Sequence, residues 1–140
     1  ESSDKETLND AKRYSIDNDL QIERVKFLEK IGIKVKAMYI LGLPKDNKIT
    51  FKETVKYAIN INSSFSQFSV FTPYPGTPIF KEYEKKLTSK KFIDFNQWKL
   101  VFKHNNLSNN DVRELLGYAY MKYYLRFKWI LGKLPKILFS

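Results

Sequence analysis

Cysteine is absent from the 140-residue sequence, which excludes disulfide bonds and thiolate-bound metals or clusters within these residues. No apolar run approaches the roughly 20 residues that span a bilayer. The only histidine, His104, stands in a stretch rich in Lys and Asn, and we expect it to be a solvated loop residue. The common H-x-x-x-H, Walker A, G-x-G-x-x-G and G-x-S-x-G motifs are also missing, so the sequence offers no standard metal, phosphate or hydrolase site.

Acidic residues are scarce towards the end of the chain. The sequence has 25 Lys and Arg against 15 Asp and Glu, a net charge of +10, and no acid follows Glu114. The basic residues beyond that point are Lys122, Arg126, Lys128, Lys133 and Lys136. A Lys-rich exposed surface explains such an excess, and so does attraction to a polyanion or an anionic membrane. The charge alone leaves both explanations open.

Apolar material is plentiful, with 43% hydrophobic and 16% aromatic residues, so we expect a packed core rather than disorder. The chain begins at Glu1 without an initiator Met, and we expect that residues once preceded it. No signal peptide is visible. We therefore expect a cytoplasmic protein, with peripheral membrane contact as the alternative.

Hydrophobic periodicity and capping residues predict five helices. The first two are expected over residues 4–13, after a capping box at Ser3–Glu6, and over residues 18–31, before Gly32. A capping box at Thr50–Glu53 predicts a helix over 50–61. The fourth begins at Pro78, is capped by Thr77 and carries Ile79, Tyr83 and Leu87 on its apolar face. The last is expected as one long helix from Ser108 to Gly132.

Two strands are predicted, over residues 33–41 and 67–71, and they alternate with the helices. This order is typical of βαβ units in a parallel sheet. Two strands are too few for a complete sheet or barrel, so we expect part of a larger α/β layer. Residues 1–88 would form that layer, and residues 89–140 a C-terminal extension with a long basic amphipathic helix.

Ligands of parallel α/β folds bind in the loops at the carboxyl ends of the strands. The loops that qualify here are residues 42–47 and residues 72–78. Gly42 would let a ligand approach the backbone of the first loop, and prolines stiffen the second. A plain turn is the alternative for each loop, and the residues leave it open.

Gln67 and Ser69 are polar residues on one face of a strand that we expect to be largely buried. They either satisfy each other or the backbone, or they point into a polar interior and contact a ligand. The sequence does not decide between these two arrangements.

Three segments together resemble a known family: Glu1-Ser2, residues 39–44 and residues 67–78. They are similar to the second half of radical S-adenosylmethionine (radical SAM) enzymes, above all to the group with an N-terminal cobalamin-binding domain. The tail from Trp98 to Arg126 also looks like the C-terminal region of that group. The resemblance covers nearly the whole chain, and the segment 72–78 is its most specific part.

This resemblance implies the last strands and helices of a partial parallel (β/α)6 barrel, followed by a helical extension. It implies a [4Fe–4S] cluster, held by a Cys-x3-Cys-x2-Cys loop, that reduces SAM to a 5′-deoxyadenosyl radical. In the cobalamin-containing group, methyl transfer is a frequent outcome. Because no cysteine is present, we expect no metal ligand here and no activity from this chain alone.

Carried over residue by residue, the resemblance places Glu1 and Ser2 beside the ribose or amino-acid part of SAM. Ile40 and Gly42 would lie along the adenine. The family usually reads Gly-Leu-Pro-Gly-Glu-Thr after this strand, whereas Lys45 and Asp46 here replace the second Gly and the Glu. That departure weakens any role assigned to the loop.

The same resemblance places Gln67 and Ser69 towards the barrel interior, with Thr72 and Tyr74 at its mouth near adenine or substrate. The expected partners are a small-molecule or lipid-like substrate and the missing N-terminal portion of the enzyme. The resemblance identifies no catalytic residue within this chain.

Two other hypotheses remain. One is a non-catalytic truncated module that binds a nucleotide-like ligand or a partner protein. The other is a basic module that contacts an anionic membrane through residues 112–139, with nucleic acid not expected as a partner. The apolar stripe of that segment favours packing on the barrel over membrane contact.

Overall fold

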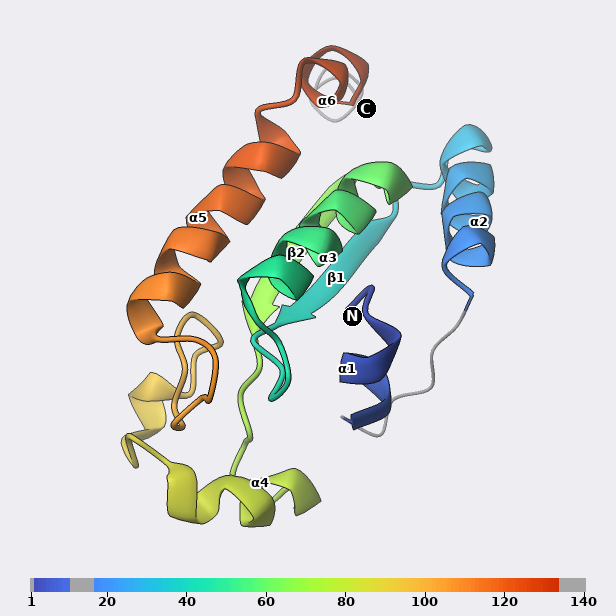
Figure 1. Cartoon of the computed structure of the whole chain (residues 1–140). Coiled ribbons are helices and arrows are strands. Elements are labelled where there is room, and N and C mark those ends of the chain that lie inside the picture. The colour runs from blue at the N-terminus through green and yellow to red at the C-terminus, as the bar shows by residue number, and fades with distance from the viewer. Residues whose placement is uncertain (1, 11–16, 134–140) are drawn as a thin grey trace.

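Two six-residue strands pair in parallel at the centre of the computed structural model, which describes residues 2–10 and 17–133 (Figure 1). The strands are β1 (Lys36–Leu41) and β2 (Phe65–Val70), joined through α3 (Lys48–Ile61). Tyr39 stands opposite Phe68 in the register. The predicted parallel βαβ unit is therefore confirmed, although β1 begins three residues later than expected and β2 two residues earlier.

One face of this sheet carries the hydrophobic core. Tyr39, Leu41, Phe68 and Val70 alternate along the strands and are buried there. The face is covered by α3 and by α5 (Asn109–Tyr124), which also contact each other. The residues of these helices that join the core are Phe51, Val55, Ala58, Ile61, Val112, Leu115, Leu116, Ala119 and Tyr123. One core thus contains residues from both predicted segments, 1–88 and 89–140.

Tyrosine hydroxyl groups of α5 satisfy the outer edge of β2. The Tyr120 hydroxyl accepts from the Phe68 amide at 3.2 Å and donates to the Phe68 carbonyl at 3.1 Å. One turn further, the Tyr124 hydroxyl makes the same pair of bonds with Ser66, at 2.8 and 2.7 Å. The Val70 amide donates to a loop carbonyl at 2.7 Å. All three outward-facing amides of β2 therefore have partners without another strand.

The start of α3 differs from the prediction of a capping box at Thr50–Glu53. Asn47 is the N-cap, and its side chain accepts from the amides of Ile49 (2.8 Å) and Thr50 (3.2 Å). The Thr50 hydroxyl accepts in turn from the Asn47 amide at 3.0 Å. Thr50 is thus the third helical residue of the box rather than its first, and the helix begins at Lys48.

The predicted helix from Ser108 to Gly132 is broken into two. Ser108 and Asp111 form the expected capping box of α5, but the helix ends at Tyr124 and α6 occupies Phe127–Gly132. Between them, Arg126 has an extended backbone. Its guanidinium donates to the carbonyls of Tyr123 (2.7 Å) and Ile59 (3.2 Å). These bonds satisfy carbonyls near the ends of α5 and α3 and tie the break to α3.

The N-terminal capping box predicted at Ser3–Glu6 is also wrong. Asp4 caps α1 (Lys5–Asp10) instead, because its carboxylate accepts from the Thr7 amide at 2.7 Å. The Ser3 hydroxyl forms a hydrogen bond with the Thr54 hydroxyl of α3 at 3.2 Å and therefore does not cap α1. Residues 11–13 of the predicted helix lie outside the described residues.

The second helix, α2 (Asn18–Lys30), packs beside α3. Its N-cap is Asp17, one residue before the expected Asn18. The predicted left-handed turn at Gly32 is confirmed by a φ of 93°. None of the helices formed by the described residues has the length and apolarity needed to cross a membrane.

The helix predicted from Pro78 is shorter than its apolar pattern. After α4 (Pro78–Tyr83) come two short 3-10 helices, η1 (Glu84–Lys86) and η2 (Phe92–Asp94). Leu87, expected on the helix face, instead forms an isolated antiparallel bridge with Phe102. Thr77 makes no capping bond, since its hydroxyl donates to the Tyr74 carbonyl at 2.6 Å.

Candidate functional site

The loops that follow β1 and β2 leave the sheet at the same end, because the strands are parallel and Leu41 pairs with Val70. Both candidate loops, residues 42–47 and 72–78, therefore begin side by side (Figure 1). This end of the sheet lies far from α6 and nearer to α4. It is the end where ligands bind in parallel α/β folds.

The first loop is held by internal hydrogen bonds. Asp46 is buried, and its carboxylate accepts from the Leu43 amide at 3.0 Å and from the Thr50 hydroxyl at 2.8 Å. Burial raises the pKa of the Asp46 carboxyl, and these hydrogen bonds act against that rise. Gly42, with a φ of 72°, supplies the left-handed turn into the loop. The loop is therefore ordered before any ligand arrives.

The prediction that His104 is a solvated loop residue is wrong. The side chain is only 9% exposed, and its Nε2 lies 2.9 Å from the Leu43 carbonyl. Its Nδ1 accepts from the amides of Asn106 (3.0 Å) and Leu107 (3.2 Å). Since Nδ1 accepts these bonds, the ring proton resides on Nε2, which donates to Leu43. His104 thus fastens the loop after β1 to the segment before α5.

The second loop is also ordered, although by fewer bonds. The Thr72 hydroxyl donates to the Val70 carbonyl at 3.0 Å, and Pro73 is fully buried. Tyr74 is more exposed, and its ring lies 6.5 Å from that of Phe95. Thr72 and Tyr74 therefore stand just beyond the carboxyl end of β2.

The second face of the sheet is not packed like the first. Met38 pairs with Gln67 and Ile40 with Ser69 in the register, so these four side chains share one face. Met38 is 58% exposed, and the other three are half-buried. The Gln67 amide donates to the Ser69 hydroxyl at 3.3 Å. We call these four residues the open face; it combines apolar surface with a polar pair and leads to the candidate loops.

The remaining predicted site residues lie apart from the open face. Ser2 is buried, and its hydroxyl lies 3.3 Å from that of Thr54 on α3 and accepts from the Asp4 amide at 3.2 Å. Glu1 lies outside the described residues. The structure thus brings Ile40, Gln67 and Ser69 together on one face of the sheet, and the two candidate loops begin next to them. Ser2 instead lies against α3, beside Thr54.

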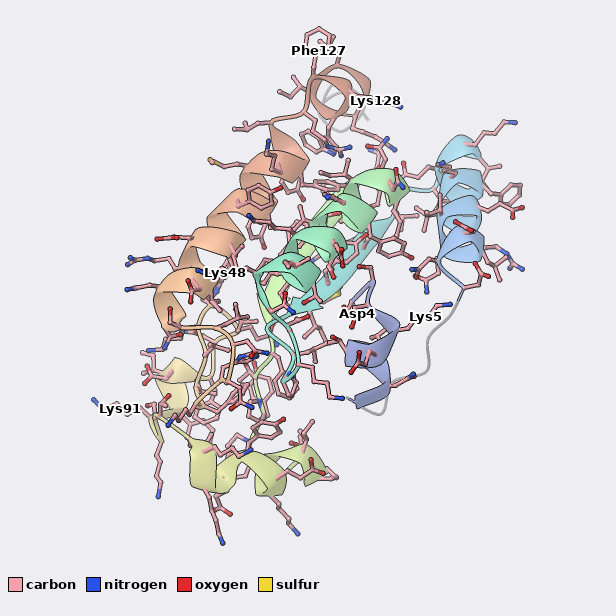
Figure 2. All side chains as sticks on the ribbon, in the orientation of Figure 1. Asp4, Lys5, Lys48, Lys91, Phe127 and Lys128 are labelled. Carbon is pink, nitrogen blue, oxygen red and sulfur yellow. The ribbon has the colours of Figure 1, made fainter. Side chains whose placement is uncertain are left out.

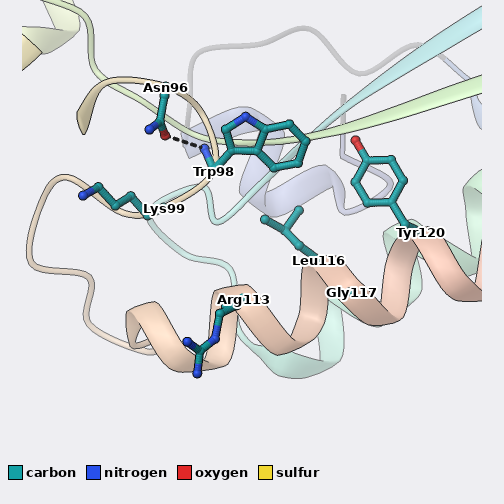
Figure 3. Close-up of a pocket in the computed structure, with 7 residues that line it drawn as sticks. All are labelled: Asn96, Trp98, Lys99, Arg113, Leu116, Gly117 and Tyr120. Carbon is teal, nitrogen blue, oxygen red and sulfur yellow. Dashed lines mark hydrogen bonds between the residues drawn. The ribbon is translucent and has the colours of Figure 1, made fainter. Parts of the chain in front are cut away.

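A separate groove of about 520 Å³ lies between α5 and the loop that precedes it (Figure 3). Trp98 and Tyr120 line it, with Leu116 and Gly117 between them and Arg113 at one end. Apart from Trp98, no feature of the sequence pointed to this groove. None of the predicted site residues lines it, so it is distinct from the open face.

The chain does not fit an iron–sulfur cluster. It has no cysteine, and no group of three or more His, Asp or Glu side chains that could hold a metal occurs among residues 2–10 and 17–133. A cluster would therefore have to be held by residues outside this chain.

No protein-family profile matches the chain. It is 28% identical over 110 residues to an uncharacterized methyltransferase of Pyrococcus horikoshii, covering 75% of this chain and 23% of that protein. It is 24% identical over 104 residues to the anaerobic magnesium-protoporphyrin IX monomethyl ester cyclase of Cereibacter sphaeroides, covering 74% of this chain and 17% of that protein.

A third relative is the bacteriochlorophyllide d C-12(1)-methyltransferase of Chlorobaculum tepidum, 26% identical over 90 residues, which are 64% of this chain and 20% of that protein. The chain thus spans between 17% and 23% of the length of these three relatives. These three relatives at low identity are two methyltransferases and a cyclase, and the activities in their names belong to much longer proteins.

Proposed function

We propose that this chain is the C-terminal part of the SAM-binding barrel of a radical SAM enzyme, with methyl transfer as its reaction class and cobalamin as a further cofactor. The observation that carries the proposal is the open face. Parallel sheets are normally covered on both faces, yet among residues 2–10 and 17–133 helices pack on one face only. The open face is what the inner wall of a barrel would present.

The residues of this face suit the two chemical parts of an adenosyl group. Met38 and Ile40 offer apolar contact to an adenine ring, and the resemblance assigns Ile40, together with Gly42, to that ring. Gln67 and Ser69 offer an amide and a hydroxyl that can bond ribose or adenine atoms. On binding, their mutual 3.3 Å bond would be exchanged for bonds to the ligand.

The candidate loops support the same role. Because the internal bonds of Asp46 and His104 already fix the loop after β1, little conformational entropy is lost when a ligand contacts it. Thr72 and Tyr74 stand at the end of β2, where a barrel would open to substrate. The [4Fe–4S] cluster, when bound by the rest of the protein, would supply the electron for SAM cleavage.

The sequence relatives support methyl transfer in particular. Two of the three are named methyltransferases, which is the outcome that the resemblance to the cobalamin-containing group implies. The substrates in the relatives' names are tetrapyrroles in two cases. We propose a small-molecule or lipid-like substrate for this chain.

The test uses the full-length protein that contains this chain, reconstituted anaerobically with iron and sulfide. Equilibrium dialysis measures the dissociation constant for SAM, and chromatography measures 5′-deoxyadenosine. The double variant Gln67→Ala/Ser69→Ala should weaken SAM binding roughly tenfold, the loss expected for one or two hydrogen bonds. Asn110→Ala, an exposed amide on α5, is the matched control and should bind as the unchanged protein does.

An unchanged dissociation constant in the double variant would contradict the assignment of the open face. SAM binding without any 5′-deoxyadenosine, in a protein whose upstream residues lack the Cys-x3-Cys-x2-Cys loop, would favour the non-catalytic module instead.

A further inference from the structure

Helix α6 is anchored by one aromatic side chain. Trp129 is buried; its indole nitrogen donates to the Ser64 carbonyl at 3.3 Å, and its ring meets Tyr124 edge-on at 4.7 Å. Side chains four residues apart share a helix face, and those two apart lie on nearly opposite faces. Burying Trp129 therefore turns Phe127 and Leu131 outwards.

The outward side chains are large and apolar. Phe127 is 78% exposed, Leu131 60%, and Leu125, just before the helix, 69%. Figure 2 shows Phe127 and Lys128 projecting at the end of the molecule beyond α5. We call Leu125, Phe127 and Leu131 the α6 tip. The predicted packing of the last segment is confirmed for α5, but the α6 tip does not share it.

A cavity of about 360 Å³ adjoins the tip, between α6, α2 and the end of α3. Four of its lining side chains are cationic (Lys26, Arg126, Lys128 and Lys133), against one carboxylate, Glu29. Glu29 forms an ion pair with Lys133, whose Nζ lies 2.6 Å from the Glu29 carboxylate. Arg126 bonds only neutral oxygen atoms among the described residues, so its charge is not cancelled. We call this the basic cavity.

Another exposed apolar pair occurs at the other end of the molecule, on η2, where Phe92 is 82% exposed beside Ile93. Asp94 follows directly and forms an ion pair with Lys99 at 2.7 Å. The pocket beside Phe92 is lined by one cation, Lys90, and one carboxylate, Glu84, so its charges balance. No acid follows Glu114 in the sequence, so the α6 tip has no such neighbour along the chain. The basic cavity beside the α6 tip has four cations against one carboxylate, so the α6 tip is the better match to an anionic surface.

We propose that the α6 tip docks on an anionic phospholipid membrane, with its apolar side chains at the acyl boundary and a lipid phosphate in the basic cavity. Apolar residues flanked by lysines bind the bilayer interface by this combination of burial and charge. The proposal does not depend on SAM binding, because the tip lies at the end of the sheet opposite the candidate loops (Figure 1).

The test is flotation of the full-length protein that contains this chain with vesicles of phosphatidylcholine, with and without phosphatidylglycerol, at low and high salt. Binding is expected only with phosphatidylglycerol and should weaken in salt. Phe127→Ala should weaken it roughly tenfold through lost burial. Lys128→Glu should weaken it by more than about fivefold, the effect of one cation near an anionic surface.

Two matched controls make the same kinds of substitution at exposed residues near η2, at the other end of the molecule: Phe92→Ala and Lys91→Glu. Both are expected to bind vesicles as the unchanged chain does. Circular dichroism checks that each variant keeps its helices. Inorganic phosphate, added without vesicles in a thermal-shift assay, should not stabilise the chain as strongly as phosphatidylglycerol vesicles do.

Several results would overturn the proposal. They are no flotation at low salt, equal loss in Phe92→Ala, or stabilisation by free phosphate that matches the effect of vesicles. Self-association without lipid that disappears in Phe127→Ala would assign the tip to contact between two copies instead. None of these outcomes bears on the SAM dissociation constant, so the two proposals fail separately.

Discussion

Two buried tyrosines of the core differ in how their hydroxyl groups are satisfied. The Tyr123 hydroxyl donates to the Ser63 carbonyl at 2.6 Å and lies 3.1 Å from the Ser63 hydroxyl. The Tyr39 hydroxyl is buried without a hydrogen-bond partner among the described residues. Burial accordingly raises the pKa of the Tyr39 phenol well above its usual range.

The change Tyr39→Phe should raise the free energy of unfolding by roughly 1 kcal/mol, because it removes a buried polar group that has no partner. Tyr123→Phe should lower it by about 1–3 kcal/mol, because it leaves the Ser63 carbonyl without its donor. Urea denaturation of both variants measures the difference. A loss of stability in Tyr39→Phe would show that this hydroxyl has a partner in solution.

At this scale, the sequence predicted which residues stand near the candidate site but not which ones order it. Gln67 and Ser69 share one face of β2, as the strand pattern predicts. The ligand contacts that the resemblance assigns to Ile40, Gln67, Ser69 and Thr72 stay predictions. His104 was misjudged because its partner, the Leu43 carbonyl, stands 61 residues away in the sequence. A lone histidine among Lys and Asn carries no local sign of such a contact.

Among the elements, α5 has two functions in the fold: it covers the core face and satisfies the edge of β2. Removing both hydroxyl groups in Tyr120→Phe/Tyr124→Phe would leave two strand amides without acceptors. We expect the free energy of unfolding to fall by roughly 2 kcal/mol and the exposed edge to promote association. Denaturant unfolding and size-exclusion chromatography measure the two effects.

The control for this double variant is Tyr118→Phe on the same helix, whose hydroxyl bonds none of the described residues. It should leave both measurements unchanged. An equal loss in Tyr118→Phe would mean that the phenol groups act through packing or hydration, and not through the edge bonds.

Element boundaries were predicted correctly where the deciding bonds are local. The Ser108–Asp111 box and the turn at Gly32 involve neighbours in sequence, and both are present. Boundaries decided by tertiary bonds were missed. The helix after Ser108 ends early because Arg126 bonds Ile59, and Ser3 does not cap α1 because it bonds Thr54.

For the whole molecule, the open face and the unpaired side of β1 predict limited independence. Among the described residues, no strand pairs with β1 other than β2, and Met38 stands 58% exposed on the open face. We therefore expect the isolated 140 residues to self-associate or to unfold at low temperature. Light scattering coupled to chromatography, with calorimetry, measures both.

A monomer with a sharp cooperative transition would contradict this expectation and weaken the view that the chain is part of a larger barrel. A matched control is the double variant Met38→Lys/Ile40→Lys, which makes the open face polar. It should reduce association if that face is responsible and leave it unchanged if the strand edge is.

The fold class was predictable because helical and strand periods alternate along the chain, and two predicted strands already indicated an incomplete layer. Which face of the sheet is left uncovered was not predictable. Periodicity reports which side of an element is apolar, but it does not report what covers that side. The open face reads as a buried strand in the sequence, since Met38 and Ile40 are as apolar as their neighbours.

The tyrosine-satisfied edge of β2 gives the sheet a direction of growth. Additional strands can join at β1 alone, so two copies that meet edge to edge would each present their tyrosine side to the outside. Such a pair would be a closed assembly with no free end, and it would not extend into a fibre. Because the two phenol groups on α5 occupy the β2 edge, each chain can accept a further strand at its β1 edge only.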